Sequence, residues 1–142
     1  MKSIILSILF SSVFLTCSST KNQGTDSGTA EKSVSDLNGK YLVKELDGKD
    51  VSEHNITIEF NKETKTISGY SGCNTYSCAY KVEQNSISID FPMATKRYCP
   101  ETGDLEKNFF SALTSSAEAS QKSKELIMKG KEGKVLMTAS SD

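Results

Sequence analysis

The side chains most able to do chemistry in this chain are its thiols and its single imidazole. They are Cys17, Cys73, Cys78, Cys99 and His54. Cys73 stands in the run Gly72-Cys73-Asn74, with Gly69 shortly before it. Glycine adopts positive φ or lets backbones approach closely, and asparagine tolerates left-handed geometry. We therefore expect this segment to place a cysteine at a corner between two strands.

A zinc site is one use for such residues. Cys73, Cys78 and Cys99 could join His54 as a Cys₃His set. The Cys-x₄-Cys spacing is wide for zinc, and His54 lies in a polar segment far from the cysteines. We therefore favour an ordinary loop histidine and predict no metal.

Enzymatic machinery is not evident in the sequence. There is no Gly-x-Ser-x-Gly elbow, no phosphate-binding loop and no Cys-x-x-Cys pair. The motifs typical of nucleophilic, phosphoryl-transfer and thiol-redox active sites are therefore missing from the sequence. Carboxylate pairs such as Asp47 with Asp50, or Glu101 with Asp104, fall at a turn and a helix start, where acids serve structure. We predict no catalytic residues and no cofactor.

The N-terminus reads as a bacterial lipoprotein signal peptide at residues 1–16. Lys2 precedes a run from Ile4 to Leu15 that is apolar but too short to span a bilayer. The run ends in Phe14-Leu15-Thr16-Cys17, which resembles a lipobox. In such a motif the cysteine becomes the first mature residue and carries lipid such as palmitate, so we expect Cys17 to anchor the chain to a membrane.

Composition divides the rest of the chain in two. Residues 17–36 are polar, without aromatic side chains, and predict a flexible tether. Residues 37–142 are long enough for one domain with a single core. The whole chain balances 17 basic against 18 acidic side chains, and no segment is basic enough to indicate nucleic-acid binding.

Hydrophobic periodicity in residues 37–142 is mostly that of strands. Alternation predicts strands over 40–46, 55–60, 64–70, 76–82 and 86–91, with weaker strands at 116–121, 125–129 and 134–139. An apolar stripe predicts a helix over 101–115. The fold class expected is α+β: a strongly bent, antiparallel, barrel-like β-sheet with one packed α-helix.

Three blocks of the sequence resemble the META domain family. Gly72-Cys73-Asn74 followed by Tyr76 and Tyr80 is similar to its Gly-Cys-Asn signature, and Thr95 four residues before Cys99 resembles its second block. Glu106, Phe109 and Leu113 resemble its helix, so the likeness covers residues 37–139. The family includes a heat-inducible envelope lipoprotein. The resemblance implies an antiparallel, barrel-like α+β fold and carries no catalytic residues.

Lipid on Cys17 would leave an odd number of thiols in an oxidising compartment. We favour a Cys73–Cys99 disulfide, with Cys78 as a buried thiol that packs like a small apolar residue. Three separate reduced thiols, or a bond between chains, are the alternatives. Arg97 and Tyr98, beside Cys99, are the candidate recognition surface, because tyrosine suits interfaces.

Two functional readings remain at this point. The first is a non-catalytic lipoprotein of the bacterial envelope, at the outer membrane or periplasmic face, which binds an unknown protein or small molecule or supports stress tolerance. The alternative is a carrier of a small ligand, with a pocket at the mouth of the bent sheet.

Overall fold

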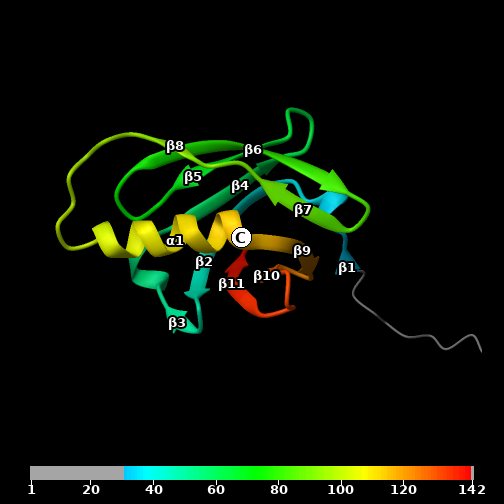
Figure 1. The fold of residues 1–142 in the computed structure, drawn as a ribbon. Coiled ribbons are helices and arrows are strands. Elements are labelled where there is room, and N and C mark those ends of the chain that lie inside the picture. The colour runs from blue at the N-terminus through cyan, green and yellow to red at the C-terminus, as the bar shows by residue number, and fades with distance from the viewer. Residues whose placement is uncertain (1–30, 142) are drawn as a thin grey trace, which may run out of the picture.

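The computed structural model describes residues 31–141 (Figure 1). The predicted signal peptide at 1–16, the predicted lipidation site Cys17 and the first part of the predicted tether lie outside the described residues. Every strand pair in the described part is antiparallel. The strands are β1 (Glu31–Lys32), β2 (Gly39–Leu46), β3 (Lys49–Asp50), β4 (Thr57–Asn61), β5 (Thr66–Tyr70), β6 (Thr75–Glu83), β7 (Ser86–Ile89), β8 (Met93–Ala94), β9 (Ser116–Lys122), β10 (Glu125–Gly130) and β11 (Val135–Ser140).

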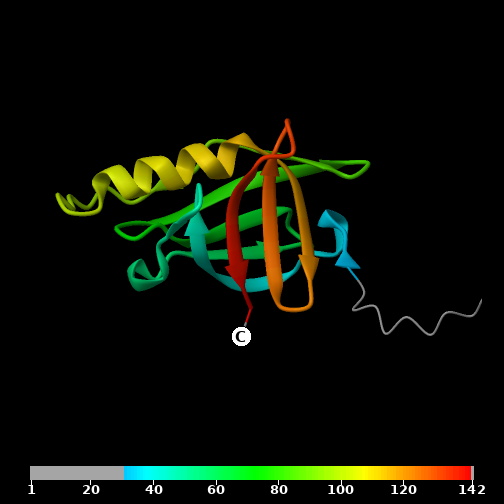
Figure 2. The ribbon, with the colours of Figure 1, turned by 90° about the horizontal axis from the view of Figure 1, so that it is seen from below.

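The strands form one 11-stranded sheet in the order β1-β9-β10-β11-β2-β4-β5-β6-β7, with β3 beside β2 and β8 beside β6. The sheet curls until β7 lies against β9, although no backbone ladder joins these two strands. Figure 2 shows the curved strands with α1 (Gly103–Ser115) lying along them. The expected α+β class, with a strongly bent antiparallel sheet and one helix, is confirmed.

The core fills the inside of the curl. Alternate side chains of the strands point inward, as the period of two predicts. Aromatic rings meet edge to face, with centroids 6.1 Å apart for Tyr41 and Phe60, and 5.7 Å apart for Phe60 and Tyr80. Such contacts are favourable beyond the area they bury. The bent sheet is therefore a half-barrel whose interior is filled by packed side chains.

The helix buries the stripe that its sequence predicts. Phe109, Ala112 and Leu113 are buried, and α1 packs against β2, β7 and β11. Two single-turn 3₁₀ helices, η1 (Val34–Asp36) and η2 (Ser52–His54), complete the helical elements of the described part. None of the described helices is long and apolar enough to cross a membrane.

The predicted end of the flexible tether is too late in the sequence. Glu31 and Lys32 pair with β9, and Val34 is buried in the core beside Leu37. Val34 is the one large apolar side chain between Thr16 and Leu37, and burying it favours ordering the residues around it. The folded domain thus begins before Leu37.

The strand predicted over 86–91 ends in an irregularity that turns Phe91 outward. Tyr80 pairs with Ile89, and Ser77 pairs with Met93. The chain therefore advances three residues along β6 but four residues from Ile89 to Met93 on the opposite side. One extra residue of this kind is a β-bulge, and it reverses which side chains point inward. Pro92 is buried and Phe91 is exposed, whereas plain alternation places Phe91 inside with Ile89.

Candidate functional site

The Gly-Cys-Asn segment forms the tight corner between β5 and β6. The Ser71 N–H donates to the Asn74 carbonyl at 2.8 Å, which closes the turn. Gly72 has φ of +92°, a left-handed conformation that other residues rarely adopt. Gly69 allows a close crossing of β4, because a Cβ at this position would lie 2.0 Å from the Thr57 carbonyl oxygen. Both glycines are therefore required by the backbone path.

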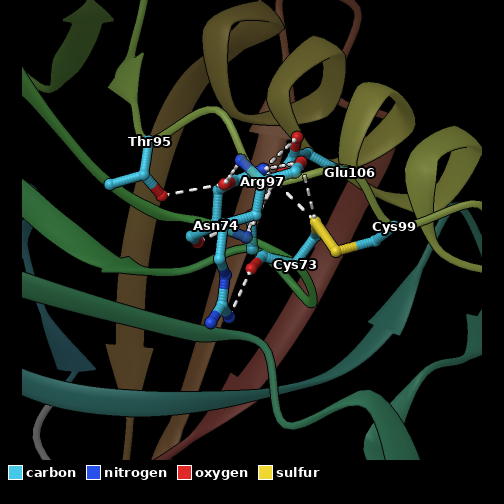
Figure 3. The surroundings of a disulfide bond; sticks show 7 residues. Cys73, Asn74, Thr95, Arg97, Cys99 and Glu106 are labelled. Atoms are coloured by element: carbon cyan, nitrogen blue, oxygen red, sulfur yellow. Dashed lines mark hydrogen bonds between the residues drawn. A yellow bond between two sulfur atoms is a disulfide. The ribbon is translucent and has the colours of Figure 1, made fainter.

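A disulfide joins this corner to the loop before α1. Cys73 and Cys99 are bonded, with their Cα atoms 6.0 Å apart and a sequence separation of 26 (Figure 3). Both sulfurs are thereby removed from the thiol chemistry considered for them, including zinc binding. The bond ties the corner to residues 95–99, which carry the candidate recognition residues.

The side chain of Asn74 connects the same loop by hydrogen bonds. Its Oδ1 accepts from the Thr95 hydroxyl and from the Arg97 N–H, each at 2.8 Å. Asn74 is only 2% exposed, and a buried amide without partners would be unfavourable. The loop is thus held to the corner twice, by the disulfide and by the amide (Figure 3).

Glu106 completes the network from the first turn of α1. Asn74 Nδ2 lies 3.1 Å from both Glu106 carboxylate oxygens, and the Asn74 N–H lies 3.2 Å from one of them. The hydroxyl of buried Ser71 also contacts this carboxylate. Hydrogen bonds to a charged acceptor are stronger than neutral ones. The side chains of Asn74 and Glu106 therefore join the corner, the loop and α1.

The sequence that contains this site matches a known family model. The model of the META domain matches residues 34–142. The chain belongs to the META domain family.

Solved structures similar to this META domain share its fold at low sequence identity. An NMR structure of a protein from Burkholderia xenovorans has a TM-score of 0.57 and 20% identity, covering 73% of this chain and 82% of that one. A crystal structure of a DUF4847 family protein from Bacteroides vulgatus has a TM-score of 0.54 and 13% identity, covering 73% and 92%. No curated protein matches the chain by sequence.

Cys78, the remaining cysteine of the META domain, is a buried free thiol on β6. Burial raises its pKa to about 11, with a further contribution from the charge of Asp90. A thiol with such a pKa stays protonated at neutral pH, and the thiolate is the nucleophile. Cys78 acts as a packing residue next to the rings of Tyr76 and Tyr80, which face the same side of β6.

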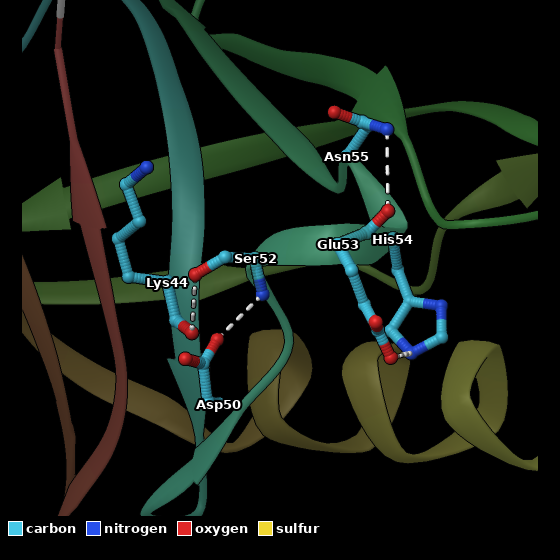
Figure 4. A network of polar contacts seen from close by, with 6 residues as sticks. All are labelled: Lys44, Asp50, Ser52, Glu53, His54 and Asn55. Carbon is cyan, nitrogen blue, oxygen red and sulfur yellow. Dashed lines mark hydrogen bonds and ion pairs between the residues drawn. The ribbon is translucent and has the colours of Figure 1, made fainter.

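The polar residues near η2 serve local turns (Figure 4). The Ser52 N–H donates to Asp50 at 2.8 Å, and this bond is the main reason that the Asp50 pKa is lowered. Asp47, its proposed carboxylate partner, lies 2.8 Å from Lys134 instead. His54 lies 3.5 Å from Glu53. Within residues 31–141, no group of three or more His, Cys, Asp or Glu side chains is placed to hold a metal ion.

The two candidate recognition residues have different surroundings. Tyr98 is 90% exposed. The backbone of Arg97 bonds to Asn74, and its guanidinium donates from Nη2 to the Cys73 carbonyl at 3.0 Å. Arg97 is therefore partly a structural residue, while Tyr98 is a free surface group on the loop that the disulfide holds.

Open space near the sheet takes the form of surface hollows. One of about 480 Å³ lies beside β1, at the seam of β7 and β9. Its lining mixes apolar Val34 and Ile127 with charged residues, among them Glu118 and Lys129. A second hollow of about 550 Å³ lies over the ends of β2, β9, β10 and β11.

Sequence reasoning did not identify the role of Glu106. It placed this residue only in the predicted helix and in the family resemblance. The contact with Asn74 spans 32 positions and leaves no local pattern in the sequence. A single acid on the inward side of an amphipathic helix is the signal that could have drawn attention to it.

Proposed function

We propose that this META domain is a non-catalytic binding module, held at a bacterial envelope by lipid on Cys17. Its contact surface is the loop that carries Arg97 and Tyr98. The observation that carries the proposal is the double attachment of this loop, by the Cys73–Cys99 bond and by Asn74. A loop that is already ordered loses less entropy when it binds.

The state of the reactive groups supports a binding role over catalysis. The Gly-Cys-Asn cysteine is oxidised, and the Asn74 amide is occupied by Glu106, Thr95 and Arg97. These groups hold the fold and are not free to act on a substrate. A disulfide also suits an oxidising compartment such as the periplasm.

The anchor is supported by the N-terminal sequence. The apolar run to Leu15, followed by Cys17, is typical of a lipoprotein signal. It favours the outer membrane or the periplasmic face of the envelope. The heat-inducible lipoprotein in the META family supports a role in envelope stress tolerance, which would follow from binding rather than from a reaction.

Incorporation of labelled palmitate tests the anchor. We expect label in the wild-type chain, none in Cys17→Ala, and wild-type label in the matched control Cys78→Ala. Equal labelling of Cys17→Ala and wild type would refute the anchor.

The second candidate, a carrier of a small ligand, is favoured by one observation. The hollow beside β1 has about 480 Å³, within the range of about 300–1,000 Å³ that small molecules occupy. Its charged lining fits a polar ligand better than an apolar one. Native mass spectrometry of the purified chain tests this candidate, because a co-purified ligand would add a discrete mass.

A further inference from the structure

Three of the four large hydrophobic side chains exposed in the described residues lie within one short stretch of chain. Phe91 and Met93 are each 81% exposed, and Tyr98 is 90% exposed. We name residues 91–98 the apolar loop. Concentrated exposure of this kind is uncommon on a soluble surface and marks contact sites.

The fold holds these side chains outward. The bulge between Ile89 and Met93 turns Phe91 to the surface and Pro92 to the inside. Met93 then pairs with Ser77 on β6, and Thr95 bonds to Asn74. Backbone pairing and the corner network therefore fix the loop in the conformation that exposes its apolar side chains.

The charged side chains within the apolar loop are both basic. Lys96 and Arg97 lie within it, and no acidic residue occurs between Asp90 and Glu101. The adjoining outward face of β5 and β6 is uncharged beside β8. Its residues are Thr66, Ser68, Tyr70, Thr75, Ser77 and Ala79. Two exposed carboxylates border this face, Glu59 opposite Ser68 and Asp90 next to Phe91, so an anionic surface would be attracted chiefly at Lys96 and Arg97.

We propose that the apolar loop inserts Phe91 and Met93 into the boundary between headgroups and acyl chains of an anionic bilayer. Tyr98 would lie at headgroup depth, where tyrosine is enriched, and Lys96 would face the anionic headgroups. The proposal rests on the proposed lipid anchor for its access to the membrane. The partner of the loop is thus the bilayer itself.

The position of the anchor favours lipid over a soluble partner. Ser18 to Ala30 is 13 residues, which span at most about 45 Å when fully extended. A domain tethered at this distance is always close to the bilayer, so even a weak membrane contact is strongly populated by its high effective concentration.

The absence of tryptophan from the chain allows a direct test. Phe91→Trp places a single tryptophan in the apolar loop, which can be excited selectively over the tyrosines. Val135→Trp is the matched control, because Val135 is 43% exposed on β11. Both variants are made in the expected mature chain, residues 17–142, carrying Cys17→Ala, so that neither an acyl chain nor the apolar run before Cys17 contributes. They are mixed with vesicles of phosphatidylglycerol and brominated phosphatidylcholine, or of brominated phosphatidylcholine alone.

We expect blue-shifted emission and bromine quenching of the Phe91→Trp variant with the anionic vesicles, and neither effect for the Val135→Trp variant. Lys96→Gln should weaken the apparent partition by about fivefold, and high salt should weaken it further. Met93→Trp provides a second reporter if Phe91→Trp does not fold. Since these chains lack Cys17, their result is independent of palmitate labelling, and either proposal can fail alone.

Three outcomes would overturn the proposal. Quenching of the Phe91→Trp variant no greater than that of the Val135→Trp variant would show that the loop stays in water. A blue shift that depends on protein concentration without vesicles would assign the loop to a second copy of this chain. A shift seen only when envelope protein is added, with none for vesicles, would assign it to a protein partner.

Discussion

Asn74 Nδ2 lies 3.1 Å from both carboxylate oxygens of Glu106, which joins the corner between β5 and β6 to the first turn of α1. The oxygen of the same amide accepts hydrogen bonds from the Thr95 hydroxyl and the Arg97 N–H. One side chain thus orders three separate segments. This explains physically why an asparagine follows the cysteine of the corner, since an amide offers donors and an acceptor at once.

Replacing Asn74 with alanine should destabilise the domain by about 2–4 kcal/mol. The change removes several buried hydrogen bonds and leaves part of the Glu106 carboxylate without donors. Urea denaturation measures the effect. Asn108→Ala, on the exposed side of α1, should change stability by less than about 0.5 kcal/mol. Equal effects of the two substitutions would contradict the network.

The Cys73–Cys99 bond should contribute about 3–4 kcal/mol, from the entropy of closing a loop with a sequence separation of 26. The double variant Cys73→Ser/Cys99→Ser should lose this amount in urea denaturation. In Cys17→Ala chains unfolded without reductant, intact mass should show one alkyl group, and three after reduction. Three groups before reduction would mean that the thiols are free.

Gly69→Ala should destabilise the domain by about 3 kcal/mol, because the new Cβ would lie 2.0 Å from the backbone oxygen of Thr57 and a strand would have to shift. Gly103→Ala is the matched control, since nothing lies within 4 Å of its Cβ position. Thermal unfolding of the two variants compares them. A Tm for Gly69→Ala close to that of Gly103→Ala would disprove the close crossing.

The stability of the domain should fall as pH rises from 9 to 11. Burial raises the pKa of Cys78 from 9.0 to about 11, so in this range the folded state holds a proton that the unfolded state has lost, and unfolding becomes more favourable. Tyr76, whose pKa burial also raises, adds to the decline at the upper end.

Urea denaturation at intervals across this pH range measures the decline. Cys78→Ala should make the free energy of unfolding fall less steeply with pH, by up to the amount that corresponds to one proton exchanged on unfolding. Val82→Ala, on the same face of β6, should lower stability at every pH and leave the slope unchanged. A wild-type slope in Cys78→Ala would exclude the thiol as the cause.

Local patterns predicted most of the secondary structure. Alternation in the segments around Phe60, Tyr80 and Met137 matches strands that bury one face, and the stripe of Phe109, Ala112 and Leu113 matches α1. These predictions hold because side-chain period and burial are coupled within a single element. The prediction of a tether to Asp36 was wrong at its end, because Glu31 and Lys32 pair with β9 and Val34 is buried in the core.

The sequence by itself determined the family, the bent antiparallel sheet with one helix, and the cysteine-bearing corner. Each of these rests on residues that are near one another in the chain. Tertiary structure alone decided that Asn74 meets Glu106, and that an extra residue opposite β6 turns Phe91 to the surface. Both depend on how distant segments register against each other. That register is set by packing the whole core, and no local pattern encodes it.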